Sequence, residues 1–251
     1  MLRYSLLLAV AALCAGQPRV IESVLPGLEY SAACASSIEL SNLSRRTVRV
    51  AVEGHYATGG LAPLSAHDGM QVELAALGRV SLRLENASGA AWAKVREPVA
   101  AGESAVVAVR GSTECLVGEQ VRTTGREAAF PTANPWFAGD VTELPGSEVA
   151  LINTSEAAVT ATGCYSSGTL VAQGGGELEP VCSSSFRVQI PPFGSREFPV
   201  RAGESTHFSI RTQGRGIVLR MMRPVEPSVR LFRVDSTIQF GGEAPGAAGK
   251  E

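Results

Sequence analysis

Apolar residues alternate with more polar or smaller residues along several short stretches of the chain, and this pattern predicts β-strands. Ile38 and Leu40 open the pattern, and Val48, Val50 and Val52 continue it. Successive strand side chains point to opposite faces, so such alternation is typical of a strand with one buried face. No stretch keeps apolar residues at three- and four-residue spacing over several turns, so the prediction is an all-β chain. Similar pairs recur at Val72 and Leu74, Leu82 and Leu84, Val107 and Val109, Val149 and Leu151, Val188 and Ile190, and Ile217 and Leu219.

The turn between the first two predicted strands occurs twice in the sequence. Residues 40–48 are matched without a gap by residues 151–159. Both copies carry an asparagine followed two residues later by a serine. Asparagine tolerates the left-handed conformation, and serine hydroxyls bond to nearby backbone, so both segments are predicted as hairpin turns. The predicted structural turn residues are Asn42, Ser44, Asn153 and Ser155.

Two further matches follow each copy in the same order. Tyr56 precedes a glycine-containing turn, and Tyr165 precedes another. A third matching segment ends at Gly78 in the first copy and at Gly194 in the second. Three matches in one order predict a single β-module used twice, with Asn42 equivalent to Asn153, Tyr56 to Tyr165 and Gly78 to Gly194.

The repeat divides the chain of 251 residues, a length that suits two ordinary domains. The expected organisation is a signal peptide at 1–16, a first β-sandwich at 17–117, a proline and aromatic join at 118–147, a second β-sandwich at 148–237 and a disordered tail at 238–251.

The N-terminus is typical of a secretory signal. Arg3 supplies a positive start, and an apolar run from Leu6 to Leu13 follows that is too short to span a bilayer. Cys14 raises a lipid-anchored alternative, but Leu13 stands where lipoprotein signals want a small residue. No later segment has the length of a transmembrane helix. We therefore expect a secreted or periplasmic protein without a lipid anchor.

Units of about a hundred residues, built from short strands and turns, indicate antiparallel β-sandwiches. With its asparagine–serine hairpin and the tyrosine-to-glycine turn, the pattern over residues 36–237 resembles tandem immunoglobulin-like or fibronectin-III-like modules of uncharacterised secreted bacterial proteins. These motifs are structural, so the resemblance implies a fold and no activity. The cysteine–tryptophan–cysteine core of antibody domains is missing, since Trp92 comes far too late after Cys34.

Four cysteines remain once the signal is removed, and an even number in an exported chain predicts two disulfides with three possible connectivities. First and last strands of such sandwiches lie side by side, which favours Cys34 with Cys115. Cys164 with Cys182 would close the base of a glycine-rich loop. The alternative is a bond between the units, such as Cys115 with Cys164.

Composition and motifs argue against several classes of function. Charged residues make up 18% of the chain and the formal net charge is -2, so no basic face for nucleic acid is expected. No phosphate-binding or dinucleotide fingerprint occurs, and no paired cysteines suggest zinc, so no cofactor is predicted. His55 and His67, with Asp68, form at best a weak metal site, and a solvated loop is the favoured interpretation.

No set of residues with catalytic spacing stands out. Ser205 and His207 lie close in sequence but lack the motif and the orienting acid of a hydrolase, so we expect no enzyme activity. Asn42, Asn86 and Asn153 match the glycosylation pattern. A shared turn explains Asn42 and Asn153 better than glycan attachment.

The join carries three aromatic residues. Phe130, Trp136 and Phe137 are too apolar for a free linker, and two interpretations stay open. The favoured one is that they dock on the flanking domains, and the other is a ligand groove at the junction.

These observations lead to a first hypothesis of a non-enzymatic secreted or cell-envelope protein with a structural, adhesive or binding role. A protein or glycan partner is possible, but the sequence does not identify one. The first alternative is a two-domain periplasmic chaperone acting by strand addition, with an edge at Val106, Val107 and Val109. The second is a carbohydrate-binding module with Trp136 as its platform.

Overall fold

The computed structural model of the protein describes residues 19–65, 71–85, 89–118, 120–140, 148–172, 178–199, 207–222 and 228–231. Within these ranges all regular elements are strands, and paired strands run antiparallel. The all-β class predicted from the sequence is therefore confirmed. The expected signal peptide and C-terminal tail lie outside the described residues.

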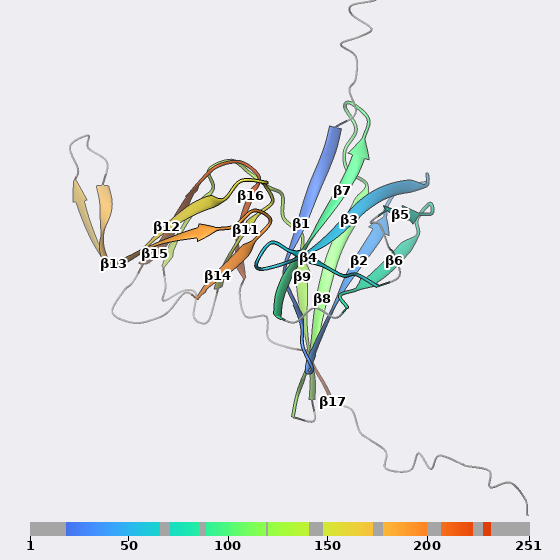
Figure 1. Cartoon of the computed structure of the whole chain (residues 1–251), viewed down its shortest axis with the longest axis horizontal. Coiled ribbons are helices and arrows are strands. Elements are labelled where there is room, and N and C mark those ends of the chain that lie inside the picture. Colours follow the sequence, from blue (N-terminus) through green and yellow to red (C-terminus); the bar gives the residue numbers. More distant parts are fainter. Residues whose placement is uncertain are drawn as a thin grey trace, which may run out of the picture.

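Strands β1 to β9, together with β17, form two sheets that we call the first unit (Figure 1). In one sheet β1 pairs with β7, β7 with β3, and β3 with both β4 and β5. In the other sheet β6 pairs with β2, β2 with β8, β8 with β9, and β9 with β17. The bounds are β1 (Arg19–Tyr30), β2 (Cys34–Asn42), β3 (Val48–Tyr56), β4 (Leu61–Ala62), β5 (Gln71–Leu74), β6 (Arg79–Arg83), β7 (Gly89–Val99), β8 (Val107–Val117), β9 (Gln120–Glu127) and β17 (Ser228–Leu231).

A hydrophobic core lies between these two sheets. Along β2 the buried Ile38 and Leu40 alternate with more exposed residues, and Val48, Val50 and Val52 do the same along β3. Period-two alternation turns one face of each sheet inward. Other core residues, drawn from both sheets, are Leu25, Leu28, Val72, Leu74, Leu82, Leu84, Val95, Val107 and Val109.

Strands β10 to β16 form another pair of sheets, which we call the second unit. One sheet has the order β10-β15-β12-β13 and the other the order β14-β11-β16. The bounds are β10 (Trp136–Asp140), β11 (Glu148–Asn153), β12 (Val159–Ala172), β13 (Leu178–Ile190), β14 (Ser195–Pro199), β15 (His207–Gln213) and β16 (Ile217–Met222). Both sheets contribute to a core that includes Val149, Leu151, Val159, Ile190, Phe198, Phe208, Ile210 and Ile217.

Strands pair in the same order in the two units. In the first, β2 lies between β6 and β8, and in the second β11 lies between β14 and β16. Likewise β3 pairs with β5 and β7, as β12 pairs with β13 and β15. The leading strands also agree, since β1 pairs with β7 and β10 pairs with β15.

The first asparagine turn is held by a buried amide. Asn42 Nδ2 donates to the carbonyl oxygens of Arg46 at 2.7 Å and Ala75 at 2.8 Å. Asn42 Oδ1 accepts from the backbone nitrogen of Ser44 at 2.9 Å and from its hydroxyl at 2.8 Å. One side chain therefore joins the β2–β3 turn to the turn after β5. The backbone of Leu77 in that second turn has a positive φ of 56°.

The second asparagine turn repeats this arrangement. Asn153 Nδ2 donates to the carbonyl oxygens of Ala157 at 2.7 Å and Pro191 at 2.9 Å. Asn153 Oδ1 accepts from the nitrogen of Ser155 at 3.0 Å and from its hydroxyl at 2.7 Å. Phe193 takes the place of Leu77, with a φ of 53°. Asn42 and Asn153 are 2% and 0% exposed, so their amides are committed to the turns and closed to a glycan.

The two tyrosines do not occupy equivalent turns. Tyr56 closes the turn after β3, where its carbonyl accepts from Gly59 and its nitrogen donates to Gly60. Tyr165 instead lies inside β12, which continues through the predicted turn to residue 172. Counted from the asparagines, Tyr165 falls at the position of Gly54. The expected match was wrong because β12 continues as a strand, with β15 pairing as far as Ser166 and β13 pairing on to Ala172.

The segment expected as a join is mostly strand. β9 pairs with β8 of the first unit, and β10 pairs with β15 of the second, which leaves 128–135 as the connection between strands. Val229 and Leu231, which fall within the range 148–237 expected for the second unit, lie in β17 and pair with β9 of the first. In the second unit, β16 pairs with β11 at the position that corresponds to β8 beside β2 in the first unit. Alternation identifies a strand, but it does not say which sheet edge the strand joins.

Candidate functional site at the seam between the two units

A third hydrophobic cluster, separate from both cores, joins the two units. Val24 and Trp92 come from the first unit, and Ile152 and Val218 from the second, and all four are at most 1% exposed. Ala129 of the connection and Phe193 pack against them. We call this cluster, together with His55, the seam.

Hydrogen bonds also cross the seam. The indole nitrogen of Trp92 donates to the carbonyl oxygen of Phe193 at 3.0 Å. The backbone nitrogen of Ser195 donates to the carbonyl of Ala57 at 2.9 Å. Gly59 approaches the second unit so closely that a Cβ on it would lie 2.1 Å from the carbonyl oxygen of Pro192. The turn between β13 and β14 is therefore fitted against the outer face of the first unit.

His55 lies within the seam, not in a solvated loop as the sequence suggested. Its residue exposure is 3%, and its ring stacks on Trp92 at 4.5 Å and on Phe193 at 5.4 Å between centroids. The expectation failed because β3 continues to Tyr56 and the second unit covers its outer face. The proposed metal partners His67 and Asp68 lie outside the described residues.

A cluster of charged side chains borders the histidine. Glu53 binds Arg96, and its other oxygen lies 3.1 Å from Lys94 Nζ and 3.4 Å from His55 Nε2. The Lys94 ammonium also lies 4.9 Å from the centre of the Phe193 ring, a cation–π geometry. Lys94 is buried, with a side-chain exposure of 6%, and Glu53 is mostly covered, with 13%.

Burial alone would raise the pKa of Glu53, but its hydrogen bond to Lys94 and the charges of Lys94 and Arg96 outweigh burial and hold the pKa below its ordinary value. Burial also lowers the pKa of His55, and the positive charge of Lys94 adds to this effect. The carboxylate of Glu53 and the nearby Gly59 carbonyl oppose the shift only in part. At neutral pH the pair is therefore an ionised carboxylate beside a neutral imidazole.

This arrangement is suited to holding surfaces together. Among the described residues, Glu53 and His55 have hydrogen-bond or ion-pair partners only in each other, Lys94 and Arg96. None of these partners is a hydroxyl or thiol that the imidazole could activate as a nucleophile. Elsewhere His207 lies on β15, whereas Ser205 lies outside the described residues.

The join aromatics separate into two kinds. Phe137 turns inward and packs against Phe208, with ring centres 6.3 Å apart, as the docking interpretation expects. Phe130 and Trp136 stay 62% and 66% exposed, and so do not dock. The two exposed rings therefore keep a binding role open.

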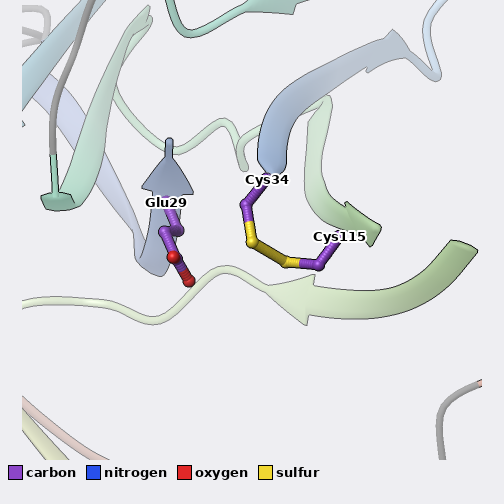
Figure 2. Close-up of side chains that lie close together, drawn as sticks. All are labelled: Glu29, Cys34 and Cys115. Carbon is purple, nitrogen blue, oxygen red and sulfur yellow. A yellow bond between two sulfur atoms is a disulfide. The ribbon is translucent and has the colours of Figure 1, made fainter. Parts of the chain in front are cut away.

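Both predicted disulfides are present, Cys34 with Cys115 and Cys164 with Cys182. Cys34 and Cys115 face each other on the paired strands β2 and β8, where Cys34 is the first residue of β2. Figure 2 shows Glu29 near this bond. The two sulfur atoms are bonded to each other and cannot serve as thiolate ligands, so the group does not make a metal site. A surface hollow of about 300 Å³ beside it is lined by residues 30–35 and 114–116 and by Val121.

Comparison with protein-family models, with curated proteins and with solved structures gives no match. In the part of the chain that the structure describes, no helix could cross a membrane. Two disulfides are typical of an oxidising, extracytoplasmic environment.

Sequence reasoning missed the seam itself. Glu53 and His55 share one parity on β3, and Trp92, Lys94 and Arg96 share one parity on β7, opposite to their core-facing neighbours. A tryptophan on an outer face, next to a histidine and charges of both signs, was the available signal. It could indicate a covered face, but not what covers it.

Proposed function

We propose that the protein is a non-enzymatic, exported protein, secreted or in the cell envelope, in which two copies of one β-sandwich module serve a structural, adhesive or binding role. The observation that carries this proposal is that buried polar side chains are engaged in hydrogen bonds and ion pairs within the fold. Asn42 and Asn153 hold turns, Glu97 accepts from the backbone nitrogens of Val106 and Val107, and the Glu53 cluster borders the seam. Groups engaged in this way hold the scaffold and are not available to substrate.

An immunoglobulin-like module is supported by the inner strand pairs. The pairs β2–β6 and β3–β7 correspond to the B–E and C–F pairs of immunoglobulin sandwiches, and β11–β14 and β12–β15 follow suit. The terminal strands depart from that plan, because β1 joins β7 and β8 joins β2. We therefore infer a variant sandwich with its first and last strands exchanged between sheets.

Export is supported by the two disulfides and by the signal-like residues at the N-terminus. Each unit contains one disulfide. The Cys34–Cys115 bond joins neighbouring strands of the first unit, and the Cys164–Cys182 bond joins β12 to β13 in the second. A pair of internally cross-linked modules suits a protein that works outside the cytoplasm.

Binding through exposed aromatic side chains is the second candidate, and Trp136 on the outermost strand of its sheet favours it. A flat, exposed indole is a suitable platform for a sugar ring or an apolar protein surface. The chaperone alternative keeps a short edge as its candidate. Val107 and Val109 pair with β2 on one side, whereas β9 pairs only with the Arg110–Val117 part of β8.

The test is affinity capture with the mature chain, from about residue 17 onward, as bait against envelope extract and soluble glycans. The wild type is compared with a Phe130→Ser, Trp136→Ser double variant. Leu43→Ser is the matched control, because Leu43 is equally exposed at 67% and lies on the first asparagine turn. A folded protein or glycan retained by the wild type and the control, but lost by the double variant, supports the binding role.

Two results would overturn the proposal. One is a captured compound that the protein converts to product in proportion to its concentration. The other is a single unfolded client held along a strand edge, which would favour a chaperone.

A further inference from the structure

The seam contains a titratable ring with an unpaired nitrogen. His55 Nδ1 is buried and has no hydrogen-bond partner among the described residues, while Nε2 lies beside Glu53. The ring faces are covered by Trp92 from the first unit and Phe193 from the second. A buried polar atom without a partner is uncommon in native structures and calls for an explanation.

A proton on His55 would find little compensation there. Its own strand supplies the Glu53 carboxylate, which already binds both Lys94 and Arg96 of the neighbouring β7. Lys94 carries a like charge. The second-unit turn that covers the ring, residues 191–194, contains two prolines, Phe193 and Gly194, and offers no titratable side chain. Protonation would thus place charge on a ring that is cut off from water, where the Trp92 and Phe193 faces, the nearby Gly59 carbonyl and the shared Glu53 carboxylate offset the lost hydration only in part.

Phe193 is the second-unit residue whose ring contacts His55. Phe193 stacks on the ring, accepts from the Trp92 indole through its carbonyl, and lies below the Lys94 ammonium. Each unit has its own core and its own disulfide, and neither core includes His55. A change at His55 therefore weakens the seam before it weakens either unit.

We propose that the seam is a pH-sensitive hinge, in which protonation of His55 releases the 191–194 turn from Trp92 while both units remain folded. The lowered pKa of the ring agrees with this direction, since burial keeps His55 neutral at pH 7 and the open state protonates more readily. The position of the equilibrium shifts toward the open state as the pH falls below the ordinary histidine value of 6.5. This inference does not depend on what the protein binds.

Trp92 is the natural reporter of opening. The chain has two tryptophans, so Trp136→Phe in the mature chain leaves Trp92 as the single emitter. Between about pH 7.5 and pH 5 we expect its emission to shift to longer wavelength, with a midpoint below pH 6.5, and to recover on return to neutral pH. Small-angle scattering should show a larger maximum dimension over the same range, while the far-ultraviolet circular dichroism stays constant.

The control is His55→Phe in the same background, which keeps a ring between Trp92 and Phe193 and cannot titrate. It should show no emission shift above pH 5. A histidine NMR titration of the unaltered chain gives a second readout that needs no substitution at His55. One imidazole should titrate with the same midpoint as the scattering change.

The hinge is refuted if Trp92 emission is unchanged down to pH 5, or if His55→Phe shifts as the wild type does. It is refuted equally if the circular dichroism is lost together with the emission shift, because that would be unfolding of a unit. An NMR midpoint that differs from the scattering midpoint would also exclude His55 as the trigger.

Discussion

The turn after β5 and the turn after β13 have the same backbone and different uses. Both are held by a buried asparagine amide, and both place their tip residue at positive φ, Leu77 at 56° and Phe193 at 53°. Leu77 is 65% exposed, whereas Phe193 packs into the seam against Trp92 and His55. The hydrogen bonds fix the backbone of the turn but do not involve the side chain at its tip. In the second unit that side chain, Phe193, packs between the two units.

The largest effect is expected from removing the asparagine amide, which both turns share. Asn42→Ala and Asn153→Ala each leave carbonyl oxygens of two turns without their donor, at a cost of about 3 kcal/mol in the free energy of unfolding. Denaturant unfolding measures both. Ser41→Ala serves as the control, since among the described residues its hydroxyl bonds to the exposed Glu39 side chain and to no turn. A large difference between the two asparagine variants would mean that the turns are not equivalent.

The next largest effect comes from comparing the residues at the tips of the two turns, Phe193 and Leu77. Phe193→Ala should destabilise the protein by about 2 kcal/mol, because it removes the ring that stacks on His55 and packs in the seam. Leu77→Ala, at the equivalent exposed position, should change stability by about 0.5 kcal/mol or less. Thermal unfolding in the Trp136→Phe background, followed by Trp92 fluorescence, measures both. Equal losses would show that Phe193 contributes to its own turn and not to the seam.

A smaller effect measures how closely the units fit. Gly59 has a φ of 96° and Gly102 a φ of 82°, so alanine strains the backbone at both, by about 1 kcal/mol. At Gly59 the new Cβ would also meet the Pro192 carbonyl, whereas at Gly102 nothing lies within 4 Å. We expect Gly59→Ala to cost about 1 kcal/mol more than Gly102→Ala. Equal losses of unfolding free energy for the two variants would mean that the Pro192 turn moves aside for the new methyl group without destabilising the protein.

The residues that local sequence predicts well are those whose partners are set by the chain itself. The asparagine turns follow from Asn42 and Asn153 with a serine two residues on, and the strands follow from period-two alternation. The cysteine pairing follows because neighbouring strands bring Cys34 opposite Cys115. In these cases the interacting groups are close in sequence or lie on strands that must pair.

The rest depends on which surfaces meet, and period-two alternation does not contain that information. His55 and Trp92 have the parity of outward residues, and only the packing of the second unit on that face buries them. Phe193 and Leu77 occupy the same kind of turn, so their sequence contexts do not separate a docked tip from a free one. Alternation likewise does not predict that β17 pairs with β9 rather than with another edge strand.

The smallest effect concerns an ion-paired charge that the first asparagine turn has and the second lacks. Arg46 of the first turn forms an ion pair with Glu103, and the equivalent position of the second turn is Ala157. The hydrogen bond and charge of Arg46 lower the pKa of Glu103, so this pair adds stability above the ordinary carboxyl value of 4.5 and loses it as the pH falls through the lowered value. Both groups are exposed, and salt screens them. Arg46→Ala, which makes the first turn resemble the second, should therefore lower the melting temperature only slightly at pH 7 and low salt, with less difference at pH 3 or in about 1 M salt. A loss that persists in high salt would show that Arg46 supports the turn by packing and not by its charge.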